Sequence, residues 1–128
     1  QYSEIVMDRT FFTTLAYCYA RSKINNTQEE YTSLFRVYEG IKHTITFPTH
    51  VIYLDVSIDE SIKRRAHYSR DSRYKNWFDP IFLGYLREFY TTELKKFFPE
   101  ILLYVDTTGL EVEEVANRVK SVLCETEI

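Results

Sequence analysis

Residues 50–60 have the sequence HVIYLDVSIDE, and this stretch decides the fold. Residues 50–56 are rich in Val, Ile, Leu and Tyr and do not alternate strictly between apolar and polar side chains. Such a run is typical of a strand buried on both faces, as in a parallel sheet, although buried helices also contain apolar runs of this length. Ser57 and Glu60 then have the spacing of a capping box, in which each side chain bonds the backbone N–H of the other. The stretch therefore predicts a strand that leads directly into a helix.

Two further apolar runs, residues 4–8 and residues 101–105, predict two more strands. Helical patterns lie between the runs and after the last one. The resulting order of strand, helices, strand, helices, strand and helix is that of an α/β protein, for which parallel strands joined by right-handed crossovers are expected. A chain of 128 residues has room for one such domain, so residues 1–128 are expected to form a single unit.

The helices are indicated by stripes of residues at helical spacing and by start signals. Thr27 and Glu30 form a second capping box, and Asp79-Pro80 has the pattern of an N-cap followed by proline at the first helical position. The helix that begins there is expected to continue without interruption until Pro99. The stripes are Phe11, Leu15, Cys18 and Tyr19; Tyr31, Leu34, Phe35, Tyr38 and Ile41; Phe82, Tyr85, Leu86, Phe89, Glu93 and Phe97; and Val112, Val115, Val119 and Val122.

Composition excludes several classes of protein. The net charge of −3 argues against a protein that binds a nucleic acid polymer through bulk charge. No apolar run approaches the roughly 18 to 20 residues of a membrane-spanning helix, and no stretch resembles a signal peptide. Cys18 and Cys124 have no metal-like or redox-like spacing, so reduced thiols are expected. We therefore expect a soluble, cytoplasmic protein without membrane contact.

Glycine is scarce, and its distribution is informative. The only glycines are Gly40, Gly84 and Gly109, and none has the spacing of a Walker A loop, whose backbone N–H groups wrap a phosphate. The chain also begins at Gln1 and enters an apolar run within a few residues. From these features we expect a fragment of a longer protein.

Asp8-Arg9 is the first candidate for chemistry, because it follows the first predicted strand. Ligands of open parallel sheets gather at the carboxyl ends of strands. There Asp8 could hold Mg²⁺ and Arg9 could pair with a phosphate. The same dipeptide is also consistent with a simple salt bridge at the end of a strand.

A basic segment is the second candidate. Residues 63–75 carry six cationic side chains and one acidic one, Asp71. Concentrated positive charge in an otherwise acidic chain suits the binding of a polyphosphate, and a mobile lid often has this position after a strand and a short helix. A solvated basic loop is the alternative. The cations are Lys63, Arg64, Arg65, Arg70, Arg73 and Lys75.

The third candidate is Asp106-Thr107-Thr108-Gly109, at the carboxyl end of the last predicted strand. This turn could place backbone groups against an adenine ring, or it could be an ordinary connection in which Gly109 supplies a positive φ. Most aromatic side chains fall on helix stripes and are expected in the core. Tyr17 is the exception, because it follows Asp8-Arg9 closely.

Taken in order, these segments resemble the carboxyl-terminal part of the P-loop nucleoside and nucleotide kinases, the group of thymidylate kinase and the deoxynucleoside kinases. Residues 8–17, DRTFFTTLAY, are similar to the family's Asp/Glu-Arg-Ser/Tyr motif. Residues 51–64 resemble the strand and helix that lead into the arginine-rich lid, and residues 82–90 resemble the helix after it. The resemblance covers nearly the whole chain and implies a three-layer P-loop NTPase-type parallel sheet with flanking helices, lacking its amino-terminal P-loop portion.

The resemblance also implies an activity and a set of site residues. The complete protein would transfer the γ-phosphoryl group of ATP, with Mg²⁺, to a nucleoside or nucleoside monophosphate, and it could form a homodimer. Asp8 would serve the metal and the acceptor, Arg9 the phosphates and Tyr17 the acceptor. Residues 66–77 would form the lid, with Arg64, Arg70 and Arg73 closing on ATP, and Thr107, Thr108 and Gly109 would meet the adenine.

Departures from the family pattern leave other functions open. Thr10 stands where the family has Ser or Tyr, Cys18 falls where thymidylate kinases carry Gln, and the glutamates that follow the lid arginines in deoxynucleoside kinases are missing. One alternative is a non-catalytic domain of the same ancestry that binds a nucleotide or a protein. Another is a P-loop phosphotransferase with a non-nucleoside acceptor. The 128-residue chain by itself is expected to be inactive.

Overall fold

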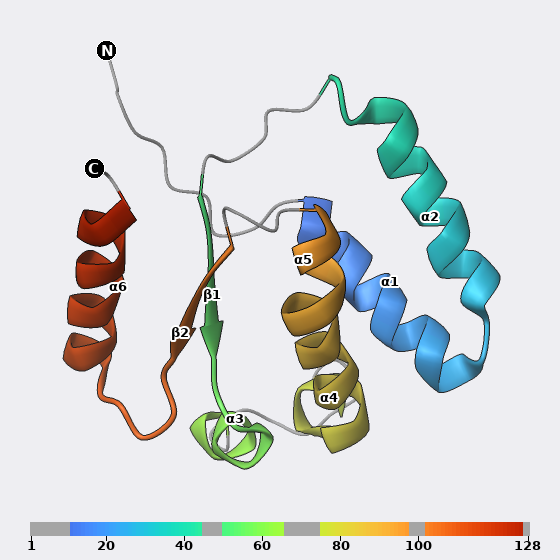
Figure 1. The fold of residues 1–128 in the computed structure, drawn as a ribbon. Helices are drawn as coiled ribbons and strands as arrows, with labels where there is room; N and C mark the ends of the chain where they lie inside the picture. Colours follow the sequence, from blue (N-terminus) through green and yellow to red (C-terminus); the bar gives the residue numbers. More distant parts are fainter. Residues whose placement is uncertain (1–10, 45–49, 66–74, 98–101, 127–128) are drawn as a thin grey trace. The chain divides into compact units, whose positions relative to one another are not determined.

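The computed structural model describes residues 11–44, 50–65, 75–97 and 102–126 (Figure 1). In these residues the protein is of the mixed α/β class, mostly helical with a two-stranded parallel sheet. The chain divides into two compact units, Gln1–Thr46 and Phe47–Ile128. The strand expected at residues 4–8 lies outside the described residues.

The first unit contains a helical hairpin made of α1 (Phe11–Asn25) and α2 (Gln28–Ile41). Asn26 lies between the helices with φ of 56°, a left-handed conformation that asparagine tolerates at the end of a helix. The ring of Tyr38 contacts Phe11, Phe12 and Phe35 at centroid distances of 5.8 to 5.9 Å. The aromatic stripe of α2 therefore packs against α1, as expected for a core face.

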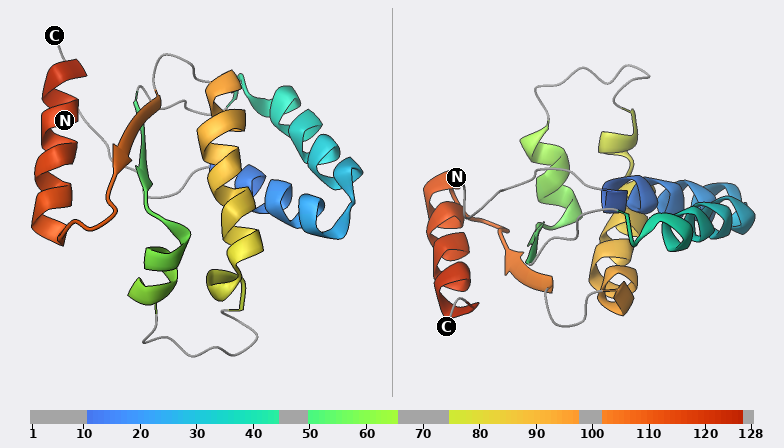
Figure 2. Two further views of the ribbon diagram at one scale, coloured as in Figure 1. Left: turned by 60° about the horizontal axis from the view of Figure 1, so that its bottom comes forward. Right: turned by 90° about the horizontal axis from the view of Figure 1, so that it is seen from above.

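The second unit is built around β1 (Val51–Asp55) and β2 (Leu102–Asp106). The strands pair in parallel from Val51 opposite Leu102 to Asp55 opposite Asp106. Two of the three predicted strands are thus confirmed, and so is their parallel direction. In both Figure 1 and Figure 2 the strands lie between α6 on one side and α4 with α5 on the other.

The helices of the second unit begin where the start signals indicate. α3 (Ile58–Arg64) has Ser57 as its N-cap, whose hydroxyl accepts a 3.3 Å hydrogen bond from the backbone N–H of Glu60. α4 (Pro80–Glu88) has Asp79 as its N-cap, with a 3.0 Å bond from the backbone N–H of Ile81. The last helix is α6 (Val112–Thr126).

The long helix expected to reach Pro99 is interrupted. A π-helical turn (Phe89–Glu93) follows α4 and leads into the short α5 (Leu94–Phe97). The expected stripe included Glu93, but Phe89 and Leu94, five residues apart, are the fully buried side chains here. The wider π turn accommodates the extra residue between these two buried positions.

Candidate functional site

The described candidate residues of the second unit meet at the carboxyl ends of the two strands. Asp55 and Asp106 are the last residues of β1 and β2, and they are partners in the sheet. Because the strands are parallel, the chain leaves both of them at the same edge, where ligands of open α/β sheets are usually bound. β1 continues into the first turn of α3, and β2 continues into residues 107–109.

The backbone N–H groups of the turn after β2 donate hydrogen bonds to neighbouring parts of the second unit. The Thr107 N–H and the Thr107 hydroxyl each donate a 2.7 Å hydrogen bond to the carbonyl oxygen of Asp55. The Thr108 N–H donates to Asp106 at 3.0 Å, and the Gly109 N–H donates to Glu60 at 2.8 Å. Gly109 has φ of 77°, which explains why glycine stands there.

The turn also presents two backbone acceptors, the carbonyl oxygens of Thr108 and Gly109. Among the described residues of the second unit, none donates a hydrogen bond to the carbonyl oxygen of Thr108 or Gly109. Both residues are exposed. The turn therefore offers hydrogen-bond acceptors to a ligand, and its N–H donors are already occupied.

Arg64 lies against this turn, so the structure brings together four of the predicted site residues. Its Nη2 atom donates to the carbonyl oxygen of Thr107 at 2.9 Å, and its Nη1 atom is 3.4 Å from the Thr107 hydroxyl. Nη2 is also 3.4 Å from a carboxylate oxygen of Glu60. The Arg64 side chain remains 41% exposed, so part of it is accessible to a ligand.

Glu60 has a different role from the one its capping-box position predicts. The Ser57 half of the box forms, but the Glu60 carboxylate binds the Gly109 N–H and Arg64, and the Ser57 N–H donates to the Thr108 hydroxyl at 3.0 Å. In the first unit the Thr27 hydroxyl makes no cap bond. Both predicted helix starts are confirmed, whereas the full reciprocal box is absent at both among the described residues.

A buried carboxylate beneath this edge was missed by sequence reasoning. The Asp55 side chain is 1% exposed. Arg87 on α4 donates to it from Nε at 2.9 and 3.1 Å and from Nη2 at 2.7 Å, and Tyr53 donates at 3.1 Å. The hydroxyl of Tyr104 also donates to it. An acidic residue at the end of an apolar strand was the only local signal for this cluster.

The cluster changes the pKa values of its members. Burial raises the pKa of the Asp55 carboxyl, but hydrogen bonds from Arg87 and Tyr104 outweigh this effect and hold the pKa below its usual range. Burial, together with the negative charge of Asp55, raises the pKa of Tyr53. The ring of Tyr53 also stacks on Tyr90, with centroids 4.9 Å apart. The Asp55 carboxylate is therefore ionised near neutral pH, and its oxygens accept several hydrogen bonds.

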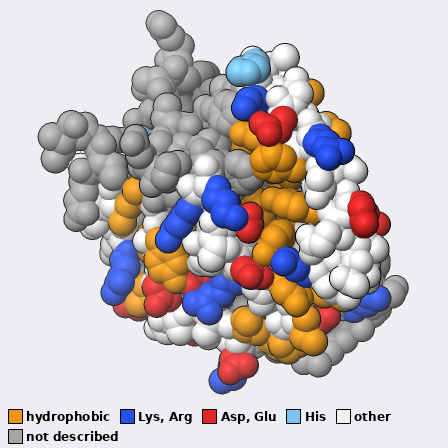
Figure 3. Space-filling model, turned by 45° about the vertical axis from the view of Figure 1, so that its right-hand side comes forward, with side chains coloured by type: hydrophobic (Ala, Val, Ile, Leu, Met, Phe, Trp, Pro, Cys, Tyr) orange, Lys and Arg blue, Asp and Glu red, His pale blue; other side chains and the backbone are white. Residues whose placement is uncertain are grey.

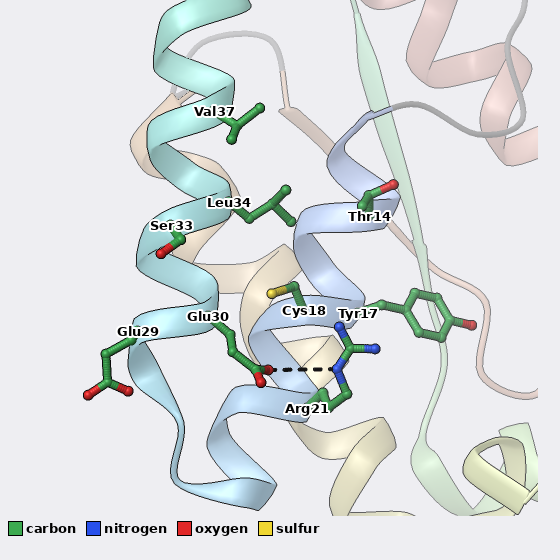
Figure 4. Close-up of a pocket in the computed structure, with 9 residues that line it drawn as sticks. All are labelled: Thr14, Tyr17, Cys18, Arg21, Glu29, Glu30, Ser33, Leu34 and Val37. Atoms are coloured by element: carbon green, nitrogen blue, oxygen red, sulfur yellow. Dashed lines mark ion pairs between the residues drawn. The ribbon is translucent and has the colours of Figure 1, made fainter.

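Tyr17 belongs to the first unit, where a cavity of about 920 Å³ lies between α1 and α2. In the close-up of Figure 4, Cys18 and Leu34 lie between the two helices, whereas the ring of Tyr17 points away from α2. Arg21 and Glu30 face each other at this cavity with 4.0 Å between Nε and Oε2. On the face shown in Figure 3, hydrophobic side chains lie beside both acidic and basic ones.

Asp8, Arg9, Arg70 and Arg73 lie outside the described residues, as does the part of the expected lid at residues 66–74. The lid's last residues, 75–77, fall in a 3-10 helix (Lys75–Phe78) rather than in a loop. In the described part of the chain, no three His, Cys, Asp or Glu side chains form a group that could hold a metal ion.

Both cysteines are free thiols, with Cys18 buried and Cys124 exposed. Of the helices that the structure describes, none has the length and apolar character to cross a lipid bilayer. The sequence matches no protein family model, and no curated protein matches it.

Proposed function

We propose that the protein is an ATP-dependent phosphotransferase acting on a nucleoside or a nucleoside monophosphate. The observation that carries the proposal is the arrangement at the carboxyl edge of the strand pair. There an exposed guanidinium, Arg64, lies on a turn whose Thr108 and Gly109 carbonyl oxygens accept no hydrogen bond from the described residues.

This arrangement is suited to an adenine base. The exocyclic amine of adenine is a hydrogen-bond donor, and the carbonyl oxygens of Thr108 and Gly109 are acceptors. The planar guanidinium of Arg64 can stack on a flat aromatic ring. We therefore assign Arg64 to the base of the nucleotide, together with the turn of residues 107–109.

The phosphate end of the substrate is assigned to residues outside the described part of the chain. Arg9, Arg70 and Arg73 would pair with phosphate oxygens, and Asp8 would hold Mg²⁺. In this proposal the ion is held by Asp8 and by the phosphates. When bound, Mg²⁺ would neutralise charge on the phosphates. Phosphoryl transfer depends mainly on such positioning and charge neutralisation, and it needs no covalent nucleophile from the protein.

The test is a phosphoryl-transfer assay on the protein expressed from its complete coding region. The protein is incubated with MgATP and a panel of nucleosides and nucleoside monophosphates, and Arg9→Ala and Arg64→Ala are compared with the wild type. We expect turnover with at least one acceptor, a large loss of kcat in Arg9→Ala, and a rise in the KM for ATP in Arg64→Ala.

The matched control is Arg36→Ala, which removes an exposed arginine that the proposal does not use. Turnover that is unchanged in Arg9→Ala would refute the role of that residue. If the protein binds MgATP but transfers phosphate to none of the acceptors, the proposed enzymatic activity is refuted and a non-catalytic nucleotide-binding domain is supported.

A further inference from the structure

Asp55 connects the candidate nucleotide-binding turn to the rest of the second unit through two separate sets of hydrogen bonds. Its main-chain carbonyl oxygen accepts both the N–H and the hydroxyl of Thr107, each at 2.7 Å. Its side chain accepts hydrogen bonds from Arg87, Tyr53 and Tyr104. One residue therefore joins β1, β2, α4 and the turn.

The side-chain bonds fix the position of Asp55. A carboxylate with 1% exposure is stable only while hydrogen-bond donors surround it. Arg87 makes a bidentate contact through Nε and Nη2, and such a pair of parallel hydrogen bonds, here called the fork, restrains the orientation of the carboxylate as well as its distance. Tyr104 adds a donor from the neighbouring strand.

The position of Asp55 in turn determines the position of Thr107. Both polar hydrogens of Thr107 are directed at one carbonyl oxygen, so a rotation of the Asp55 peptide moves Thr107 with it. The carbonyl oxygen of Thr107 is the acceptor for Arg64. A displacement of Asp55 would therefore reach both the turn and the guanidinium proposed to bind the base.

We propose that Asp55 is a positioning residue for nucleotide binding, held in place by Arg87 and Tyr104, and that it acts on the base through Thr107 and Arg64 without touching the ligand. This inference rests on the proposed function. It goes beyond it by assigning a role to an ion pair that lies beneath the binding edge.

The experiment separates positioning from general stabilisation by using two ligands. MgATP presents both a base and phosphates, whereas inorganic tripolyphosphate with Mg²⁺ presents phosphates alone. In the complete protein we expect Arg87→Met to raise the Kd for MgATP about tenfold, equivalent to about 1.4 kcal/mol, while the Kd for tripolyphosphate changes less than about twofold. Arg87→Lys, which keeps a cation but not the fork, should recover part of the loss.

Two further variants keep the inference falsifiable. Tyr104→Phe removes one donor to Asp55 and leaves the Arg87 pair intact, so it serves if Arg87→Met does not fold; we expect a smaller loss of the same kind. Lys96→Met removes an exposed ion pair with Glu93 at 3.2 Å and should leave both Kd values unchanged. Loss of affinity for both ligands alike, or for neither, would overturn the inference.

Amide hydrogen exchange distinguishes failure of this inference from failure of the proposed function. If Asp55 positions the turn, Arg87→Met should speed exchange at the N–H groups of Thr107 and Gly109 but not in α6, with no ligand present. If the wild type binds no MgATP, the proposed function and the nucleotide part of this inference both fail. The exchange rates then decide whether Asp55 positions the turn; unchanged rates would overturn that part too.

Discussion

The Asp55–Arg87 pair should matter more for stability than the other ion pairs that the structure describes. Arg87→Met leaves a buried carboxylate with only tyrosine hydroxyls as side-chain donors. Since the Arg87 side chain is 44% exposed, water compensates part of the loss, and we expect the free energy of unfolding to fall by about 2 kcal/mol.

Urea unfolding followed by circular dichroism measures this change, and Lys96→Met is the matched control. Lys96 is 69% exposed, so its pair with Glu93 should contribute less than about 0.5 kcal/mol. If the two substitutions lower the free energy of unfolding equally, the burial of Asp55 does not strengthen its ion pair with Arg87.

Asp55 should also impose a pH dependence on stability. Its carboxyl has a lower pKa in the folded protein than in the unfolded chain, because the hydrogen bonds from Arg87 and Tyr104 outweigh the effect of burial. Its stabilising contribution is therefore complete above the unfolded pKa, about 4, and is lost as the pH falls through the folded pKa. We expect the free energy of unfolding to decrease as the pH is lowered below about 4, and to decrease less steeply in Asp55→Asn.

Asp106→Asn is a useful comparison for this pH profile. The backbone N–H of Thr108 lowers the pKa of the Asp106 carboxyl too, but this residue is exposed. An acid profile in Asp55→Asn that is as steep as that of the wild type would mean that other carboxyl groups control the acid transition.

The helix caps differ in strength although their sequences look alike. Ser57→Ala removes a hydroxyl that accepts a hydrogen bond from the Glu60 N–H, and it should lower the free energy of unfolding by about 1 kcal/mol. Thr27→Ala removes a buried hydroxyl for which the described residues provide no partner, so it should cost less than about 0.5 kcal/mol. Chemical unfolding of both variants measures the two losses of free energy of unfolding, and a larger loss in Thr27→Ala than in Ser57→Ala would contradict the assigned caps.

The π turn between α4 and α5 offers a second test at the level of elements. Phe89 and Leu94 are both fully buried with a separation of five residues, which the π turn permits. Deletion of the exposed Thr92 brings them to a four-residue separation, which an ordinary α-helix places on one face. We expect this deletion to cost less than about 1 kcal/mol.

Deletion of Gly84 is the control for the π turn. It rotates the buried Phe82 and Leu83 away from the face that Phe89 occupies, and it should cost about 3 kcal/mol or more. Urea unfolding of the two deletion variants compares them directly. If deletion of Thr92 is as damaging as deletion of Gly84, the π turn is not a removable insertion in the helix.

At the scale of the whole molecule, nucleotide binding should appear as thermal stabilisation. A ligand present at about 100 times its Kd adds about 2.7 kcal/mol to the free energy of unfolding. MgATP should therefore raise the Tm of the complete protein. The Mg²⁺ complex of inosine triphosphate should raise the Tm less. Its base has an oxygen in place of the amine of adenine, and it therefore lacks the donor whose hydrogen bond the carbonyl oxygens of Thr108 and Gly109 would accept. Equal shifts with the two nucleotides would contradict the assignment of the base to this turn.

Much of the element order could be predicted because its signals are local. Apolar runs marked both described strands, and the N-caps Ser57 and Asp79 marked the starts of α3 and α4. The proximity of Arg64 to the turn after β2 was also foreseeable, since the carboxyl ends of parallel strands share an edge. A single domain was expected from the length of the chain, whereas the chain divides into two compact units.

What the amino-acid sequence determined by itself was therefore where the two described strands lie and where helices such as α3 and α4 begin, because these signals depend on side chains within a few residues of one another. Only the tertiary structure decided where Asp55, Glu60 and Leu94 direct their side chains. The partners of Asp55 include Arg87, 32 residues away, and Tyr104, 49 residues away. Such pairs depend on strand register and on which helix face becomes buried, and a buried charge takes whichever donors the packed chain brings to it.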